Sequence, residues 1–116
     1  MLLFCFGYSW PAEVERWHKD ESTDLGEASS LLFIAESDEQ IALHIGEEVA
    51  EQFVRQLFAP AEYSWRRDGF ARWIEHDPVV LDWARLNEVP IVFNDTTAEI
   101  TRVVSELTIR GERSVT

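Results

Sequence analysis

Residues 41–57 carry the longest regular hydrophobic pattern in the chain. At 100° per residue their apolar side chains fill an arc of about 220°, which only Gln56 interrupts. The preceding residues 37–40 (Ser-Asp-Glu-Gln) match a capping box, so we predict a helix that begins here with Ser37 as its N-cap. Alternation at the start of the pattern leaves a hairpin over residues 31–45 as the alternative. We prefer the helix because its period persists for about four turns, and so wide an arc indicates a central, well-covered element.

Shorter patterns predict the other elements. Apolar runs predict strands at residues 2–8, 31–35 and 90–93. Prolines or capping residues predict helices at residues 11–20, 78–86 and 96–109, with Asp77 and Thr96 as caps and Asn87 as a helix end. The Asp-Gly pair at 68–69, between aromatic-rich residues 63–66 and 70–75, predicts a β-hairpin. Residues 20–30 are polar and predict a long loop.

The order of these elements predicts the fold class. Helices that follow strands favour an α/β or α+β sandwich of two or three layers, with a mixed sheet of four to five strands and about four helices. A chain of 116 residues suits one domain, which we place at residues 1–110. Residues 111–116 are expected to be a frayed C-terminal tail.

Composition excludes several classes of function. The single cysteine, Cys5, cannot build a disulfide framework or a thiolate metal site, and no run approaches the roughly 20 apolar residues of a membrane span. The net charge of −12 disfavours nucleic acid, and phosphate-binding glycine loops are absent from the sequence. We therefore expect a cytoplasmic protein with no membrane or nucleic-acid partner, no cofactor and no bound metal.

The charge is concentrated in one half of the chain. Residues 12–51 contain twelve acidic residues and only two basic ones, whereas the remainder is almost balanced. Three of the acids, Glu47, Glu48 and Glu51, lie with His44 on the polar face of the predicted central helix. Acids at i+3 and i+4 from a histidine can ligate a metal, but a second histidine is missing. We interpret this face as solvated and as a candidate contact for a basic protein.

The predicted hairpin forms a second candidate surface. Trp65 and Trp73 would face each other across it, close to Arg67. Tryptophan and arginine dominate binding hot spots, so this hairpin could bind a partner or a second copy of the chain.

Candidate catalytic groups are few. His76 stands between Glu75 and Asp77 and could act as a general base. Neighbours in sequence rarely form a working dyad, and Asp77 is better explained as a helix cap. Cys5 lies in an apolar run without a basic neighbour that would activate it. The sequence thus predicts no catalytic residue.

Three hypotheses follow for the function. The first is a small non-catalytic binding protein of the bacterial immunity or inhibitor type, which docks a basic partner through its acidic N-terminal half. The second is a homodimeric accessory module that uses the Trp/Arg hairpin. The third is a small metal-dependent enzyme that uses His44 or His76 with nearby carboxylates.

Overall fold

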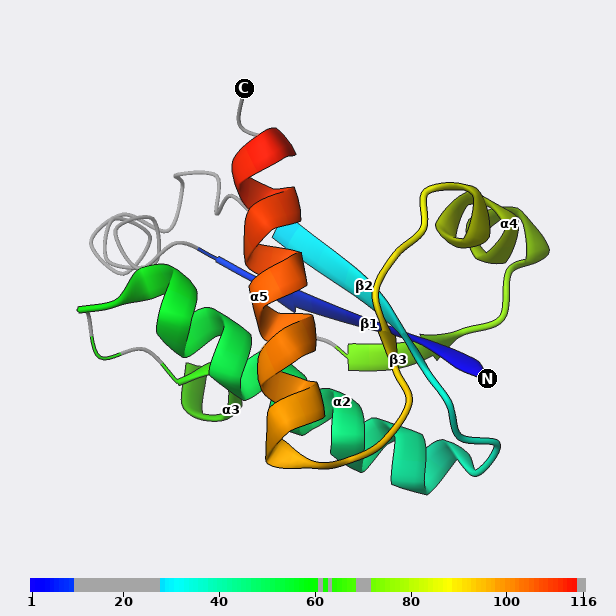
Figure 1. Ribbon diagram of the computed structural model, residues 1–116, viewed down its shortest axis with the longest axis horizontal. Helices are drawn as coiled ribbons and strands as arrows, with labels where there is room; N and C mark the ends of the chain where they lie inside the picture. The colour runs from blue at the N-terminus through cyan, green and yellow to red at the C-terminus, as the bar shows by residue number, and fades with distance from the viewer. Residues whose placement is uncertain (10–27, 61, 63, 69–71, 115–116) are drawn as a thin grey trace, which may run out of the picture.

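The computed structural model describes residues 1–9, 28–60, 62, 64–68 and 72–114 (Figure 1). Its elements in chain order are β1 (Leu2–Tyr8), β2 (Ala28–Ile34), α2 (Glu39–Phe58), α3 (Trp65–Asp68), β3 (Arg72–Glu75), α4 (Pro78–Leu86), β4 (Ile91–Val92) and α5 (Thr97–Ser114). The predicted helix at residues 11–20 and most of the predicted loop at 20–30 lie outside the described residues.

The four strands form one mixed sheet in the order β3-β1-β2-β4. Strand β1 is antiparallel to both β2 and β3, and β2 is parallel to β4. Phe4 of β1 lies opposite Leu32 on one side and Ile74 on the other. The prediction of a single α+β domain around a mixed sheet is confirmed.

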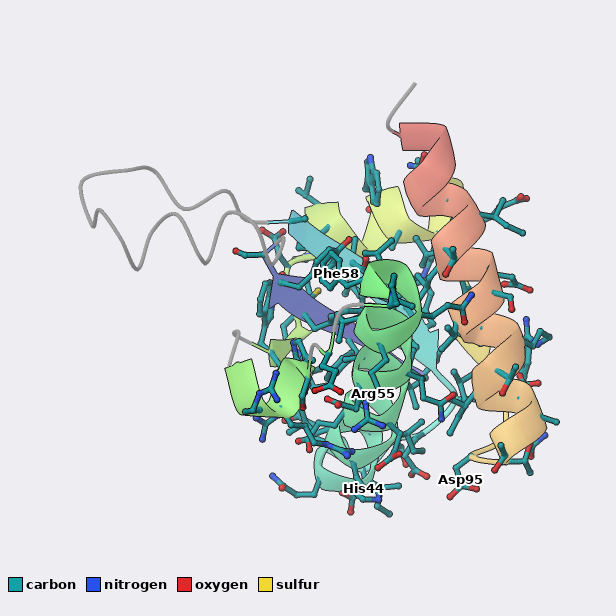
Figure 2. All side chains as sticks on the ribbon, turned by 90° about the vertical axis from the view of Figure 1, so that its left-hand side faces the viewer. His44, Arg55, Phe58 and Asp95 are labelled. Carbon is teal, nitrogen blue, oxygen red and sulfur yellow. The ribbon has the colours of Figure 1, made fainter. Side chains whose placement is uncertain are left out.

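Helix α2 confirms the central helix and rules out the alternative hairpin. Its N-cap is Asp38, not Ser37: Asp38 Oδ1 accepts the N–H groups of Gln40 at 2.9 Å and Ile41 at 3.2 Å. Ser37 was the wrong choice because a carboxylate one residue closer to the helix accepts both amides and also favours the positive end of the helix dipole. Figure 2 shows α2 lying over the sheet, with His44 near its beginning and Phe58 at its end.

The predicted apolar arc of α2 is correct except at two residues. Ile41, at its start, is exposed, whereas Glu51, on the predicted polar face, is buried. Gly46 lies against the ring of Phe4 so closely that a Cβ on it would come within 2.5 Å of a ring carbon. The helix therefore packs on β1 with no space for a larger side chain at this point.

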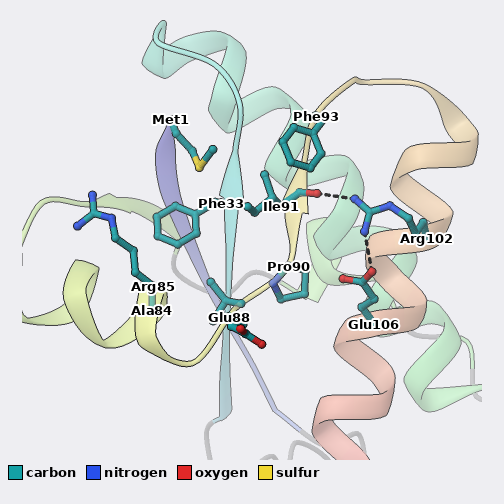
Figure 3. Close-up of a pocket in the computed structure, with 11 residues that line it drawn as sticks. Met1, Phe33, Ala84, Arg85, Glu88, Pro90, Ile91, Phe93, Arg102 and Glu106 are labelled. Carbon is teal, nitrogen blue, oxygen red and sulfur yellow. Dashed lines mark hydrogen bonds and ion pairs between the residues drawn. The ribbon is translucent and has the colours of Figure 1, made fainter.

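Alternation along β1 divides the core into two layers. Phe4, Phe6 and Tyr8 face α2 and α5, whereas Leu3 and Cys5 face α4. Figure 3 shows α4 and α5 on opposite sides of the strands. The molecule thus has three layers, and within the described chain one face of the sheet is covered by two long helices and the other by the nine-residue α4.

The predicted hairpin at residues 63–75 is wrong. Residues 65–68 form the short helix α3, and β3 pairs with β1 instead of with the segment before it. The helical turn lets Trp65 enter the core, where its Nε1 donates to the carbonyl oxygen of Gly7 at 3.0 Å. Burial of this large aromatic outweighs the turn preference of the Asp-Gly pair.

Other boundaries differ by a few residues. Strand β2 begins at Ala28, inside the predicted loop, because Ala28–Ser30 continue the pairing with β1. Helix α5 continues to Ser114, past the predicted end near Ile109. The predicted caps of α4 are confirmed: Asp77 Oδ1 accepts the N–H of Val79 at 2.9 Å, and Asn87 is the C-cap. No helix in the described ranges has the length and apolar character needed to cross a membrane.

Candidate functional site

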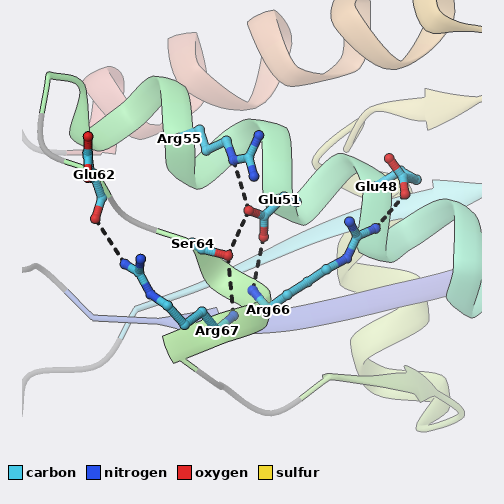
Figure 4. Close-up of polar contacts among 7 residues, drawn as sticks. All are labelled: Glu48, Glu51, Arg55, Glu62, Ser64, Arg66 and Arg67. Carbon is cyan, nitrogen blue, oxygen red and sulfur yellow. Dashed lines mark hydrogen bonds and ion pairs between the residues drawn. The ribbon is translucent and has the colours of Figure 1, made fainter.

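The acidic residues predicted to bind a partner are paired with arginines of the same chain. Figure 4 shows two of these pairs: Glu48 with Arg66 joins α2 to α3, and Glu51 with Arg55 lies within α2. The pairs are Glu47 Oε1 with Arg72 Nε at 2.7 Å, Glu48 Oε1 with Arg66 Nη2 at 2.5 Å, and Glu51 Oε1 with Arg55 Nε at 2.9 Å. The two surfaces that the sequence predicts as separate partner sites thus contact each other along this side of the molecule.

Glu51 is the centre of this cluster. Its side chain is only 5% exposed, and it accepts hydrogen bonds from Arg55, from Ser64 Oγ at 2.9 Å and from the backbone N–H of Arg66 at 2.9 Å. Burial opposes ionisation of this carboxyl, but the three hydrogen bonds outweigh it and hold the pKa of Glu51 below its ordinary value. Glu51 therefore fastens α3 onto α2.

The tryptophans and Arg67 do not form a shared surface. Trp65 is buried and packs edge-to-face on Phe6, with ring centroids 6.2 Å apart. Trp73 is 41% exposed on β3, and its Nε1 donates to Glu75 Oε2 at 3.0 Å. Arg67 donates from Nη2 to the carbonyl oxygen of Glu62 at 3.0 Å. The residues assigned to one surface are thus divided between the core and the exterior.

The two histidines within the described residues, His44 and His76, are both exposed. His44 is exposed on α2, and His76 Nε2 lies 3.1 Å from Glu39 Oε1. Glu75 does not orient the imidazole of His76: it accepts from Trp73 Nε1 and from the backbone N–H groups of His76 and Asp77, which lower its pKa. Glu75 and Asp77 therefore build the turn that leads into α4.

The structure also bears on two other kinds of site, a reactive thiol and a metal site. Burial, followed by the charge of Glu75, raises the pKa of the Cys5 thiol to about 12, so this thiol stays protonated near neutral pH. Within the described residues, no three His, Cys, Asp or Glu side chains are grouped so that they could hold a metal ion.

Helix α4 has an apolar outer side that the sequence analysis missed. Val79, Trp83 and Leu86 follow the spacing i, i+4, i+7 and are 75%, 52% and 84% exposed. The opposite side of the helix, with Val80, Leu81 and Ala84, already packs on the sheet. Only Asp82 and Arg85 interrupt the apolar side chains of this helix, which is more apolar surface than one buried side needs, so this composition was the available signal. We name Val79, Trp83 and Leu86 the α4 stripe.

Two grooves lie between α4 and α5. The first has a volume of about 580 Å³ and contains Phe33, Ile91 and the exposed side chains of Met1 and Phe93; we name it the Phe93 groove (Figure 3). The second has a volume of about 610 Å³ and runs past Leu31 to the start of β2; we name it the Leu31 groove. Both include Glu88 and Val89, so the chain between α4 and β4 separates them.

Arg102 builds the α5 wall of the Phe93 groove. Its guanidinium donates to the carbonyl oxygen of Ile91 at 2.5 Å, to Glu99 Oε1 at 2.6 Å and to Glu106 Oε1 at 2.6 Å. Glu99 also accepts the backbone N–H of Phe93 at 3.0 Å. Hydrogen bonds from Arg102 and then from Phe93 lower the pKa of Glu99 to about 2. This network fixes the end of β4 against α5 and leaves the ring of Phe93 exposed.

Comparison with known proteins finds no matching family model, no matching curated protein and no matching solved structure. The candidate site therefore has to be judged from its own geometry. On that basis the α4 stripe and the two grooves beside it form the candidate functional site.

Proposed function

We propose that this chain is a non-catalytic protein-binding protein that docks its partner through the α4 stripe and the Phe93 groove. The observation that carries the proposal is the exposure of Val79 and Leu86 on a helix whose other side is already packed. Removing such side chains from water contributes a favourable transfer free energy of about 25 cal/mol per Å² of apolar area, which offsets part of the entropy lost on association. Aromatic groups nearby, Trp83 and Phe93, are of the kind that anchor interfaces.

The polar side of the molecule supports binding more than catalysis. Glu75 and Asp77, which sequence reasoning placed beside a catalytic His76, are engaged in backbone capping. Cys5 is buried among apolar side chains. Glu75, Asp77 and Cys5 thus have structural roles.

The test compares the double variant Val79→Ser/Leu86→Ser with Ile41→Ser, a matched control on α2 that is 48% exposed in the wild type. Quantitative affinity purification from the source cells should recover a partner with the wild type and the control, and lose it with the double variant. Circular dichroism and unfolding curves should be alike for all three. Equal recovery by the double variant would refute the α4 stripe as the docking surface.

Docking of a basic partner through the acidic half, as an immunity or inhibitor protein would do, is a second candidate. Half of its twelve acids fall within residues 10–27, outside the described residues, and the net charge of −12 favours a basic partner. Reversal of Glu47, Glu48 and Glu51 is a poor test, because it would break three ion pairs within the chain.

A better test reverses Asp20, Glu21 and Asp24 to lysine. If the acidic half steers a basic partner, the association rate should fall at low salt by an order of magnitude or more and converge with the wild type at high salt. An unchanged rate at low salt would exclude this candidate.

A further inference from the structure

The Leu31 groove lies along an incompletely paired edge of the sheet. One edge of β2 pairs with β1 over all seven residues, from Ala28 to Ile34. On the other edge β4 is only two residues long and pairs with Phe33 and Ile34. In the described part of the chain, the first five residues of β2 therefore have no neighbour on that side.

The backbone groups that face this open edge can be identified from the register. Phe33 N–H donates to the carbonyl oxygen of Pro90 and Ala35 N–H to that of Val92, each at 2.9 Å. Backbone direction alternates along a strand, so Leu31 and Ser29 present their N–H and C=O groups to the same side. Among the residues described, these groups have no hydrogen-bond partner, and such an edge is a template for another strand.

Side chains from two helices flank the edge. The chain leaves the line of β4 at Val89 and turns towards α4, so that Trp83 and Asn87 line one side of the groove. Leu107 and Arg110 of α5 line the other side, and Figure 1 shows this part of α5 beside the start of β2. Arg110 also donates to the carbonyl oxygen of Glu88, which links the two sides. The groove is thus the continuation of the line of β4.

We propose that the Leu31 groove binds an extended basic segment of a partner protein, which adds a strand to β2 in the line of β4. The segment would pair with the backbone of Ser29 and Leu31 and place alternate apolar side chains against Trp83 and Leu107. The net charge of −12 favours a segment that carries Lys or Arg. This inference rests on the proposed protein-binding function and specifies the form of the partner.

A second copy of the chain fits this edge poorly. In each copy the edge lies between side chains of α4 and α5, so two such edges could meet only if these helices collided. A single extended segment has no flanking helices of its own and can enter the groove.

The test uses random ten-residue peptides displayed on phage and selected against the whole protein. Selected peptides should carry apolar residues in both phases of the strand, because consecutive side chains face α4 and α5 in turn, and should include Lys or Arg. When they saturate the protein, they should slow amide exchange at Ser29 and Leu31 at least tenfold. Two series of peptides are then compared, with N–H groups methylated at either the odd or the even positions. Only the series that removes the N–H groups facing β2 should lose affinity, by about tenfold or more, because one net hydrogen bond is worth about a factor of ten.

Two variants at exposed positions provide the matched comparison. Trp83→Ala removes a side chain that lines the groove and should weaken peptide binding about tenfold, whereas Ile41→Ala changes α2 outside the groove and should have less than a twofold effect. The two side chains are 52% and 48% exposed, so neither variant is expected to unfold.

The outcomes separate this inference from the proposed function. Three peptide results would each overturn strand addition: unchanged amide exchange at Ser29 and Leu31, binding that is insensitive to methylation at both odd and even positions, and failure to select any peptide. A dimer of the chain that protects the Leu31 amide from exchange without peptide would also overturn it. Loss of the cellular partner from Val79→Ser/Leu86→Ser would leave the docking function standing in each case. Conversely, strand addition would hold if peptides behave as expected while that double variant retains its partner.

Discussion

The α2 side and the α4 side of the molecule differ in whether their surface side chains have partners within the chain. On the α2 side, three glutamates that look available in the sequence are matched by three arginines. On the α4 side, the helix packs one apolar face on the sheet and leaves another, with Val79 and Leu86, in water. On the α2 side these three glutamates are therefore already paired within the chain. On the α4 side, apolar side chains remain exposed to water.

This difference shows why charge alone is a poor guide to a binding surface. Exposed ion pairs contribute only about 0–1 kcal/mol to stability. Their opposite charges also cancel locally, which weakens the electrostatic field that would attract a charged partner. An exposed apolar side chain, in contrast, has no contact within the molecule that would remove it from water. The following predictions test whether the charged side chains on the α2 side support the fold, and whether the exposed apolar side chains of α4 contribute little to it.

The largest effect on stability is expected at Glu51. Glu51→Ala removes the acceptor for Ser64 Oγ and for the backbone N–H of Arg66, and should lower the free energy of unfolding by about 2–4 kcal/mol. Urea unfolding measures the change. Glu48→Ala, which removes a more exposed partner of the same arginine, is the control and should cost about 1 kcal/mol or less. Equal effects of the two variants would mean that Glu51 does not fasten α3.

The packing of α2 on β1 predicts the next largest effect. Gly46→Ala brings a methyl group against the ring of Phe4, which costs about 1–3 kcal/mol, and higher helix propensity returns up to about 1 kcal/mol. We expect a net loss of about 1–2 kcal/mol in urea unfolding. In a Phe4→Leu background the same substitution should cost less, because the ring is gone. A stabilising Gly46→Ala would contradict the close contact.

Acid should weaken the Arg102 network at the border of the Phe93 groove. The pKa of Glu99 is about 2 in the folded chain against an ordinary 4.5, so its stabilising effect is complete above pH 4.5 and is lost as the pH falls towards 2. The difference in urea midpoint between wild type and Glu99→Gln should therefore narrow over that window. In an Arg102→Gln background the narrowing should largely disappear. A difference that stays constant from pH 7 to pH 2.5 would argue against the ion pair.

The smallest effect on stability belongs to the α4 stripe. Leu86→Ser and Val79→Ser should each change the free energy of unfolding by no more than about 0.5 kcal/mol, since both side chains are already in water. Thermal unfolding of the single variants provides the measurement. A loss above 1 kcal/mol would indicate that these side chains support the fold and are not free for a partner.

Local signals explain which parts of the fold could be predicted. The period of residues 41–57 and the prolines and caps before α4 and α5 act within a few residues, so they were interpreted correctly from the sequence. The Asp-Gly pair at 68–69 failed because the burial of Trp65, which contacts Gly7 more than fifty residues away, decided the conformation before it. Pairing of β3 with β1 is equally remote in sequence.

The candidate site was harder to predict than the fold. Glu47, Glu48 and Glu51 were correctly placed together on one helix, but the arginine partners of Glu47 and Glu48 come from other segments of the chain. The α4 stripe could have been suspected from a nine-residue helix in which Asp82 and Arg85 are the only charged residues, so that its apolar side chains spread over more than one face. Which of its sides faces water depends on the register of the whole helix against the sheet.

By itself, the sequence determined the helices α2, α4 and α5, most of the strands, the caps of α4 and α5 and the excess of negative charge, because these follow from local conformation and composition. Only the tertiary structure decided which charges neutralise one another and which apolar side chains stay outside. Burial, and ion pairs such as Glu47 with Arg72 and Glu48 with Arg66, depend on distances between segments that are remote in the chain. The acids of α2 thereby became part of the scaffold, and the outer side of α4 became the candidate binding surface.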